Sequence, residues 1–173
     1  MPGTSIGTSS SRHFPRRSNG CGGAIPSKAG RARPEVIAIE VLPEPLSICR
    51  LAADAVLPEW AVGAGSFSSI TRTADELSVI CATVHVPSHA SPMTREDGWR
   101  ALKLVGPFAL TEVGVLLQIA APLAAAGISM LPVATFDTDF VLVPEDRLAN
   151  ALAVLRQAGH SVVPADFRER ATS

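Results

Sequence analysis

Residues 128–143, ISMLPVATFDTDFVLV, decide the fold, because two short apolar runs lie on either side of the turn Asp137-Thr138. Pro132 has no backbone N–H to donate to a sheet, so the first run is expected at a sheet edge or a bulge. The second run, 139–143, ends at Pro144. The stretch therefore predicts a β-hairpin with its turn at 137–138.

An amphipathic helix is predicted on each side of this hairpin. Apolar residues recur at helical spacing over 113–124, after a capping hydroxyl at Thr111 and before a glycine stop at Gly127. Pro122 lacks an N–H and is expected to bend the last turn. Pro144 opens the second helix, whose apolar face consists of Leu148, Ala151, Leu152 and Leu155.

Two further strands complete the second half of the chain. Residues 99–105 alternate apolar and polar side chains, and 161–163 form a short apolar run after Gly159. The order from Trp99 is therefore β-α-β-β-α-β. This is the ferredoxin-like α+β fold, in which two helices cover one face of an antiparallel sheet. Because the fold hosts unrelated activities, it does not by itself assign a function.

The first half divides into a tail and a strand-rich region. Residues 1–34 are rich in Ser, Gly, Arg and Pro and cannot bury enough apolar surface to fold, so a disordered tail is predicted. An organellar transit peptide is the alternative interpretation of this segment. Strand-like runs at 36–42, 46–51, 67–72 and 77–84 predict an N-terminal domain over 35–87, a linker over 88–98 and a second domain over 99–165.

Charge is distributed unevenly along the chain. The tail holds six of the 15 Lys+Arg and none of the 16 Asp+Glu, so the remainder carries a net charge of −7. Phosphate contacts need clustered cations, which argues against nucleic acid as a partner. No apolar stretch reaches the roughly 20 residues that span a bilayer. We therefore expect a cytoplasmic protein without a membrane partner.

The cysteines and histidines do not form a catalytic or structural set. Three cysteines without a CxxC pair are neither a disulfide framework nor a zinc site, and Cys49 and Cys81 are expected as reduced core residues. Along a strand, His85 would lie about 13 Å from Cys81, too far to activate it. His85 and His89 are either surface residues or metal ligands, and the former is the simpler interpretation.

Signatures of nucleotide binding and hydrolysis are absent from the sequence. Gly63-Ala64-Gly65 lacks a third glycine and a following long helix, and no GxxxxGK[ST], HExxH or GxSxG motif occurs. We therefore predict no cofactor, no catalytic residue and no enzymatic activity.

One constellation is suited to a small zwitterion. The loop and helix start 108–114 are expected to face the strand end 134–140. Unpaired amides at a helix N-terminus attract a carboxylate, and Gly114 permits close approach to the backbone. Asp139 can pair with an ammonium group. The alternative is that 137–139 is only turn chemistry, and the residues alone leave both interpretations open.

Three stretches carry a resemblance to a known family. Residues 114–116, 121–129 (APLAAAGIS) and 135–143 (TFDTDFVLV) resemble ACT-domain proteins of the CASTOR-like and small bacterial group, amino-acid-binding regulatory proteins. Residues 67–73 and 75–78 are similar to the degenerate ACT-like N-terminal half of the bacterial members.

The resemblance implies a non-catalytic sensor that binds a free amino acid between two ACT modules, so that a single copy dimerises to complete the site. The implied ligand contacts are Val113, Gly114, Val115, Thr135, Phe136 and Asp139. Residues 111–113 depart from the pattern of the arginine-binding members, so arginine specificity is not carried over. The alternatives are a ligand-free ACT module for dimerisation or protein interaction, and an unrecognised enzyme.

Overall fold

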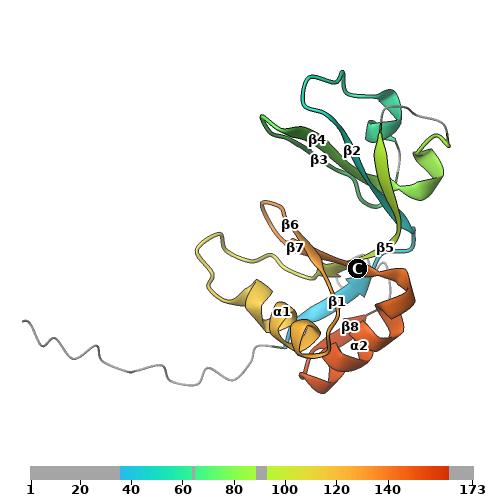
Figure 1. The fold of residues 1–173 in the computed structure, drawn as a ribbon. Coiled ribbons are helices and arrows are strands. Elements are labelled where there is room, and N and C mark those ends of the chain that lie inside the picture. Colours follow the sequence, from blue (N-terminus) through green and yellow to red (C-terminus); the bar gives the residue numbers. More distant parts are fainter. Residues whose placement is uncertain (1–35, 64, 89–92, 164–173) are drawn as a thin grey trace, which may run out of the picture. The chain divides into compact units, whose positions relative to one another are not determined.

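The computed structural model of the protein describes residues 36–63, 65–88 and 93–163 (Figure 1). The predicted tail over 1–34 and His89 therefore lie outside the described residues. The described chain contains eight strands, two α-helices and three short 3-10 turns.

The predicted βαββαβ order of the second half is confirmed. The elements are β5 (Thr94–Leu104), α1 (Val115–Ala125), β6 (Leu131–Ala134), β7 (Asp139–Pro144), α2 (Leu148–Gln157) and β8 (Ser161–Val163). β7 pairs antiparallel with both β5 and β6, so β6 with its Pro132 lies at an edge, as expected. Both helices pack on one face of this sheet (Figure 1), through a core that includes Ile119, Leu123, Leu155, Leu102 and Val141.

The strand predicted over 36–42 belongs to this same sheet and not to the N-terminal half. β1 (Ala38–Val41) lies between β5 and β8, antiparallel to the former and parallel to the latter. Ile39 is opposite both Leu104 and Val162. An apolar run indicates that a strand is buried but not which other strand it pairs with. For this reason the strand at 36–42 was assigned to the N-terminal domain together with the strands next to it in the sequence.

The N-terminal half contributes β2 (Leu46–Ala52), β3 (Ser69–Arg72) and β4 (Glu76–Ala82), paired in the order β3-β4-β2. β2 continues the sheet onto the first half of β5, where Cys49 is opposite Arg95. Residues 94–98, assigned to a linker from the sequence, are therefore part of β5. Their charges and Gly98, at a φ of 78°, hide the alternation that marks a strand.

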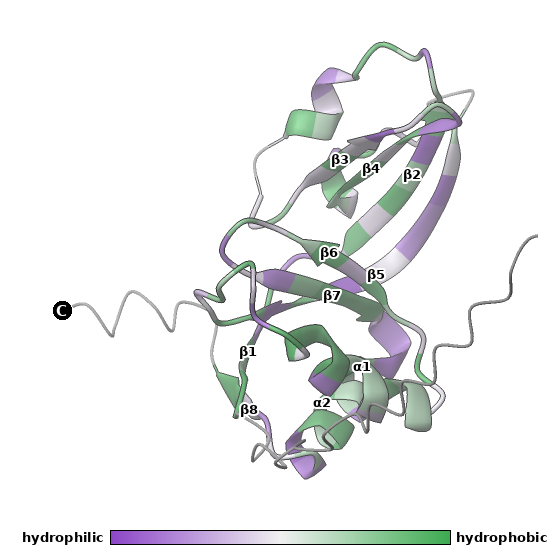
Figure 2. Ribbon diagram, turned by 90° about the vertical axis from the view of Figure 1, so that its left-hand side faces the viewer, coloured by the Kyte–Doolittle hydropathy of each residue, from purple (hydrophilic) through white to green (hydrophobic). Residues whose placement is uncertain are grey.

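Part of the second face of the C-terminal sheet is covered by the N-terminal half. Figure 2 shows that β7 is hydrophobic along most of its length, because both of its faces are covered. Val141 faces the helices, whereas Phe140 and Leu142 join a cluster with Leu46 and Phe67 on the opposite face. The rings of Phe67 and Phe140 lie 4.7 Å apart between centroids.

The two described cysteines are core residues. Cys49 and Cys81 are buried and unpaired, as predicted. Burial raises the pKa of the Cys49 thiol to about 11, and the pKa of Cys81 is raised for the same reason. Both thiols are therefore protonated and unreactive at neutral pH.

The described ranges contain neither a membrane-spanning helix nor a metal cluster. None of the helices there is long and apolar enough to cross a membrane. The same residues contain no group of three or more His, Cys, Asp or Glu side chains that could hold a metal ion. His85 lies in the short 3-10 turn Thr83–His85.

Candidate functional site

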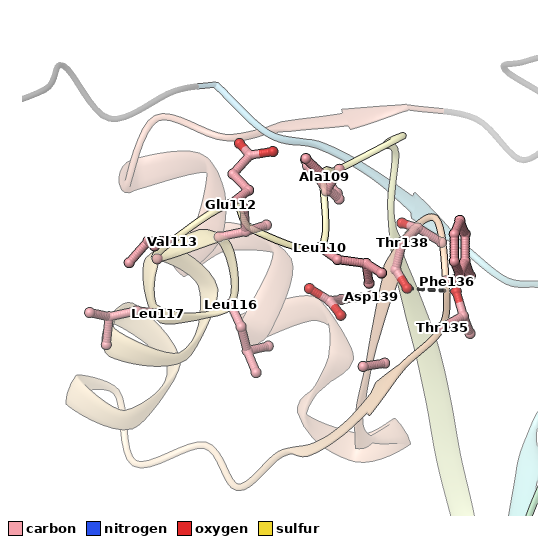
Figure 3. Close-up of a pocket in the computed structure, with 14 residues that line it drawn as sticks. Ala109, Leu110, Glu112, Val113, Leu116, Leu117, Thr135, Phe136, Thr138 and Asp139 are labelled. Atoms are coloured by element: carbon pink, nitrogen blue, oxygen red, sulfur yellow. Dashed lines mark hydrogen bonds between the residues drawn. The ribbon is translucent and has the colours of Figure 1, made fainter.

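An open pocket of about 510 Å³ lies between the start of α1 and the turn that joins β6 to β7 (Figure 3). All six residues predicted as ligand contacts line it: Val113, Gly114, Val115, Thr135, Phe136 and Asp139. The structure therefore brings together two segments that are about twenty residues apart in the sequence. Other side chains that line it include Phe108, Leu110, Glu112, Leu116 and Thr138.

The helix wall of the pocket begins later than the sequence indicated. α1 starts at Val115, and its N-cap is Gly114 with a φ of 90° and no side-chain cap. Thr111 therefore does not cap the helix. A φ of 90° is readily adopted only by glycine, so Gly114 shapes the entry to the helix. The first N–H groups of α1 have no partner within the helix and form a positive end at the pocket.

The turn wall of the pocket consists of two threonines whose hydroxyl hydrogens are already used. The backbone N–H and the Oγ1 of Thr135 both donate to the carbonyl oxygen of Thr138, at 2.9 and 2.7 Å (Figure 3). The Oγ1 of Thr138 donates to the carbonyl oxygen of Leu104. Each hydroxyl therefore has only lone pairs left, and can accept but not donate.

A glycine that the sequence did not single out holds the two walls together. The N–H of Phe108 donates to the carbonyl oxygen of Asp137 at 2.9 Å. A Cβ at Gly106 would lie 2.6 Å from that same oxygen and 2.8 Å from the Phe108 nitrogen. No side chain fits at this distance, so the close approach of loop and turn requires glycine.

The charge of the pocket is negative. Asp139 lies half-buried at the centre of Figure 3, and no hydrogen bond or ion pair to its carboxylate occurs within the described part of the chain. Glu112 stands at the rim, and no Lys, Arg or His is among the described residues that line the pocket. A cationic group would be attracted to Asp139. A carboxylate would have to be met by backbone amides at the start of α1.

The rim of the pocket is apolar and exposed. Leu110, Val113, Leu117 and Phe136 are 73%, 93%, 67% and 77% exposed. We call these four residues the apolar rim. Single exposed apolar residues are ordinary, whereas these four lie together around one opening and form an apolar patch.

The six residues predicted as ligand contacts line one pocket, but the prediction did not name all of the residues that shape it. Leu110 and Thr138 lie within the segments 108–114 and 134–140 that were expected to face each other, but they were not named as ligand contacts. Gly106 lies outside both segments. Gly106 comes directly after the strand predicted over 99–105, where a glycine is already explained by the end of the strand. Leu110 and Thr138 lie in irregular segments, where no periodicity shows which way a side chain points.

Comparison with known proteins adds the family. The model of an ACT domain matches residues 94–157, and a second model, described as an N-terminal domain, matches residues 44–89. The cytosolic arginine sensor for mTORC1 subunit 1 from Homo sapiens is 43% identical over 60 residues, 34% of this chain and 18% of that protein. The same subunit from Mus musculus is 38% identical over 69 residues. The chain thus matches about a fifth of the length of these curated relatives.

Two solved structures are similar over most of the chain. A structural-genomics target protein from Agobacterium tumefaciens is 38% identical, with a TM-score of 0.69, and the match covers 75% of this chain and 94% of that one. Aspartate kinase from Clostridium acetobutylicum is 11% identical, with a TM-score of 0.56, over 72% of this chain and 35% of the kinase. The second likeness concerns the fold alone.

Proposed function

The chain belongs to the ACT-domain proteins, and from this premise we propose that it is a regulatory protein that binds a free amino acid in the pocket between α1 and the β6–β7 turn. The protein performs no catalysis of its own and acts in the cytoplasm. The arginine sensors that it resembles motivate the assignment of an amino acid as ligand.

The single observation that carries this proposal is the pairing of opposite electrostatic features across one pocket. The positive end of α1 lies on one wall and the carboxylate of Asp139 on the other. The lone pairs of Thr135 and Thr138 add acceptors on the side of Asp139. An amino acid has an anionic and a cationic end a few ångströms apart, so both ends are satisfied at once.

A screen of the twenty amino acids by thermal unfolding tests the proposal. A ligand that binds only the folded state raises stability by about 2.7 kcal/mol at a hundred times its Kd. Because the described lining of the pocket contains carboxylates and no cation, we expect the response from apolar or basic amino acids and none from aspartate or glutamate. An unchanged Tm for all twenty at millimolar concentration would reject amino-acid binding.

The second part of the proposal is that two copies form the complete site. The apolar rim surrounds the opening of the pocket, so a second ACT module placed there would bury the rim and exclude water from the ligand. Exclusion of water strengthens the charge pairs that hold a zwitterion. The rim also supports a second candidate function, an ACT module that uses this surface only for dimerisation or protein interaction.

Light scattering measures the assembly directly. We expect a mass of twice 18.0 kDa at micromolar concentration. Replacing Leu117 and Phe136 of the rim with Ser should shift the mass toward the monomer, because an interface loses affinity when its apolar anchors are removed. As a control, Val56→Ser changes an apolar residue outside the rim that is 89% exposed, and it should leave the mass unchanged. A mass of 18.0 kDa for the unaltered protein would reject the dimer.

A further inference from the structure

Pro122 leaves a gap in the hydrogen bonds of α1. The residue lies inside the helix, where its missing N–H would have bonded the carbonyl oxygen of Gln118, four residues earlier. Gln118 is the last residue of the first turn of α1. The amides of this same turn face the pocket. An unsatisfied carbonyl here would weaken the link between the first turn and the rest of the helix.

The side chain of His160, near the end of the described chain, supplies a hydrogen bond to this carbonyl oxygen. Its Nε2 lies 3.2 Å from the carbonyl oxygen of Gln118, and its Nδ1 lies 3.4 Å from the backbone nitrogen of Ile37. The side chain is buried, with only 6% of the residue exposed. The imidazole of His160, which directly precedes β8, thus joins α1 to the segment that enters β1.

The two contacts together specify one tautomer. A carbonyl oxygen only accepts, so Nε2 must carry the hydrogen that bonds Gln118. The N–H of Ile37 only donates, so Nδ1 must present its lone pair. Both requirements are met by the neutral imidazole with its hydrogen on Nε2 and by no other form.

We propose that His160 is a positioning residue of the ligand site, which supplies the hydrogen bond that Pro122 removes from α1 and thereby holds the first turn of the helix against the sheet. This inference rests on the proposed function for its relevance to binding, but the geometry that carries it is independent of any ligand. Val115 and Ile119 fix the same turn through apolar packing, which is non-directional. The His160 bond is directional and sets the rotation of the turn.

Hydrogen exchange of the full chain tests the inference without a ligand. His160→Phe keeps a ring in the core and removes both hydrogen bonds. The amides of Ile119, Ala120 and Ala121 close the first turn, and we expect them to exchange at least about tenfold faster in this variant. A factor of this size matches the free-energy cost of a buried carbonyl that loses its hydrogen bond. His160→Gln keeps an amide donor and should recover most of the protection.

Pro122→Ala provides the matched rescue. Alanine returns the N–H that bonds Gln118, so the double variant Pro122→Ala with His160→Phe should restore protection to within about threefold of Pro122→Ala alone. If His160→Phe lowers protection equally in both backgrounds, the ring acts only by packing and the inference is overturned. NMR of the ring nitrogens should place the hydrogen on Nε2, and a hydrogen on Nδ1 would also overturn it.

A second arm connects the inference to binding. With an equimolar mixture of the twenty amino acids as probe, His160→Phe should lose at least half of the Tm increase seen for the unaltered protein, and the double variant should regain it. A full increase in His160→Phe would overturn the positioning role. If the mixture leaves the unaltered protein unchanged, the proposed function fails, and hydrogen exchange alone decides whether His160 holds α1.

Discussion

Replacing Asp139 with Asn is expected to weaken binding of the amino acid by at least about tenfold, which corresponds to about 1.4 kcal/mol. A carboxylate that pairs with an ammonium group in a partly desolvated cleft contributes roughly 2–5 kcal/mol when its loss leaves the partner charge unpaired. Asn retains the shape of the side chain, so the effect isolates the charge. Isothermal titration with the amino acid selected by the thermal screen measures it.

Asp137→Asn is the matched control for this variant. Asp137 lies two residues away in the same turn, is exposed, and is not among the residues that line the pocket. Its change should leave affinity within about twofold and the free energy of unfolding within about 0.5 kcal/mol. If Asp139 instead stabilises the turn, Asp139→Asn lowers the free energy of unfolding by about 1 kcal/mol with intact binding, which would contradict the assignment.

Replacing Gly106 with Ala is expected to lower the free energy of unfolding by about 3 kcal/mol, at the upper end of the usual cost of overpacking. The added Cβ would lie 2.6 Å from a backbone oxygen, and a backbone atom cannot rotate away as a flexible side chain can. For a chain of this length the change in Tm is roughly 6–12 °C. Thermal unfolding of the apo-protein measures it.

Gly65→Ala serves as the control, because among the described residues the nearest atom to a Cβ there is the Cβ of Ala82 at 3.8 Å, an ordinary contact. It should change the free energy of unfolding by less than about 0.5 kcal/mol. Gly106→Ala should also abolish amino-acid binding, since the loop and the turn that form the two walls would move apart. A stable Gly106→Ala protein that binds normally would show that the walls are not held by this contact.

Local patterns predicted the C-terminal architecture well because each element has its own period and its own terminators. Pro132 indicated an edge strand, and Gly127 indicated the end of α1, where its φ is 64°. The partner of β1 could not be predicted, because strand pairing is a long-range choice among several equally apolar runs. The strand at 94–98 was missed because its exposed charges resemble a linker.

The same distinction explains the outcome for the site. Asp139 and Gly114 stood out because a carboxylate after a turn and a glycine at a helix start have few local functions. The true start of α1 was misplaced by about three residues, since Thr111 is an acceptable cap and only the φ of Gly114 decides between them. Pro122 did give a usable signal for His160. A proline inside a helix leaves the carbonyl four residues earlier without its usual donor. Pro122 therefore indicates that a side chain from elsewhere in the chain donates to the carbonyl oxygen of Gln118.

The most direct test of the central claim is a titration of the full chain with the amino acid selected by the thermal screen. The backbone amide NMR signal of each residue is monitored at every ligand concentration. The account predicts that the largest shifts occur in two segments, 113–117 and 135–139, and that Asp139→Asn removes them at the same ligand concentration. Shifts centred on the separate pocket formed by residues 96–99 and 144–146 would contradict it. So would shifts at 113–117 that persist unchanged in Asp139→Asn.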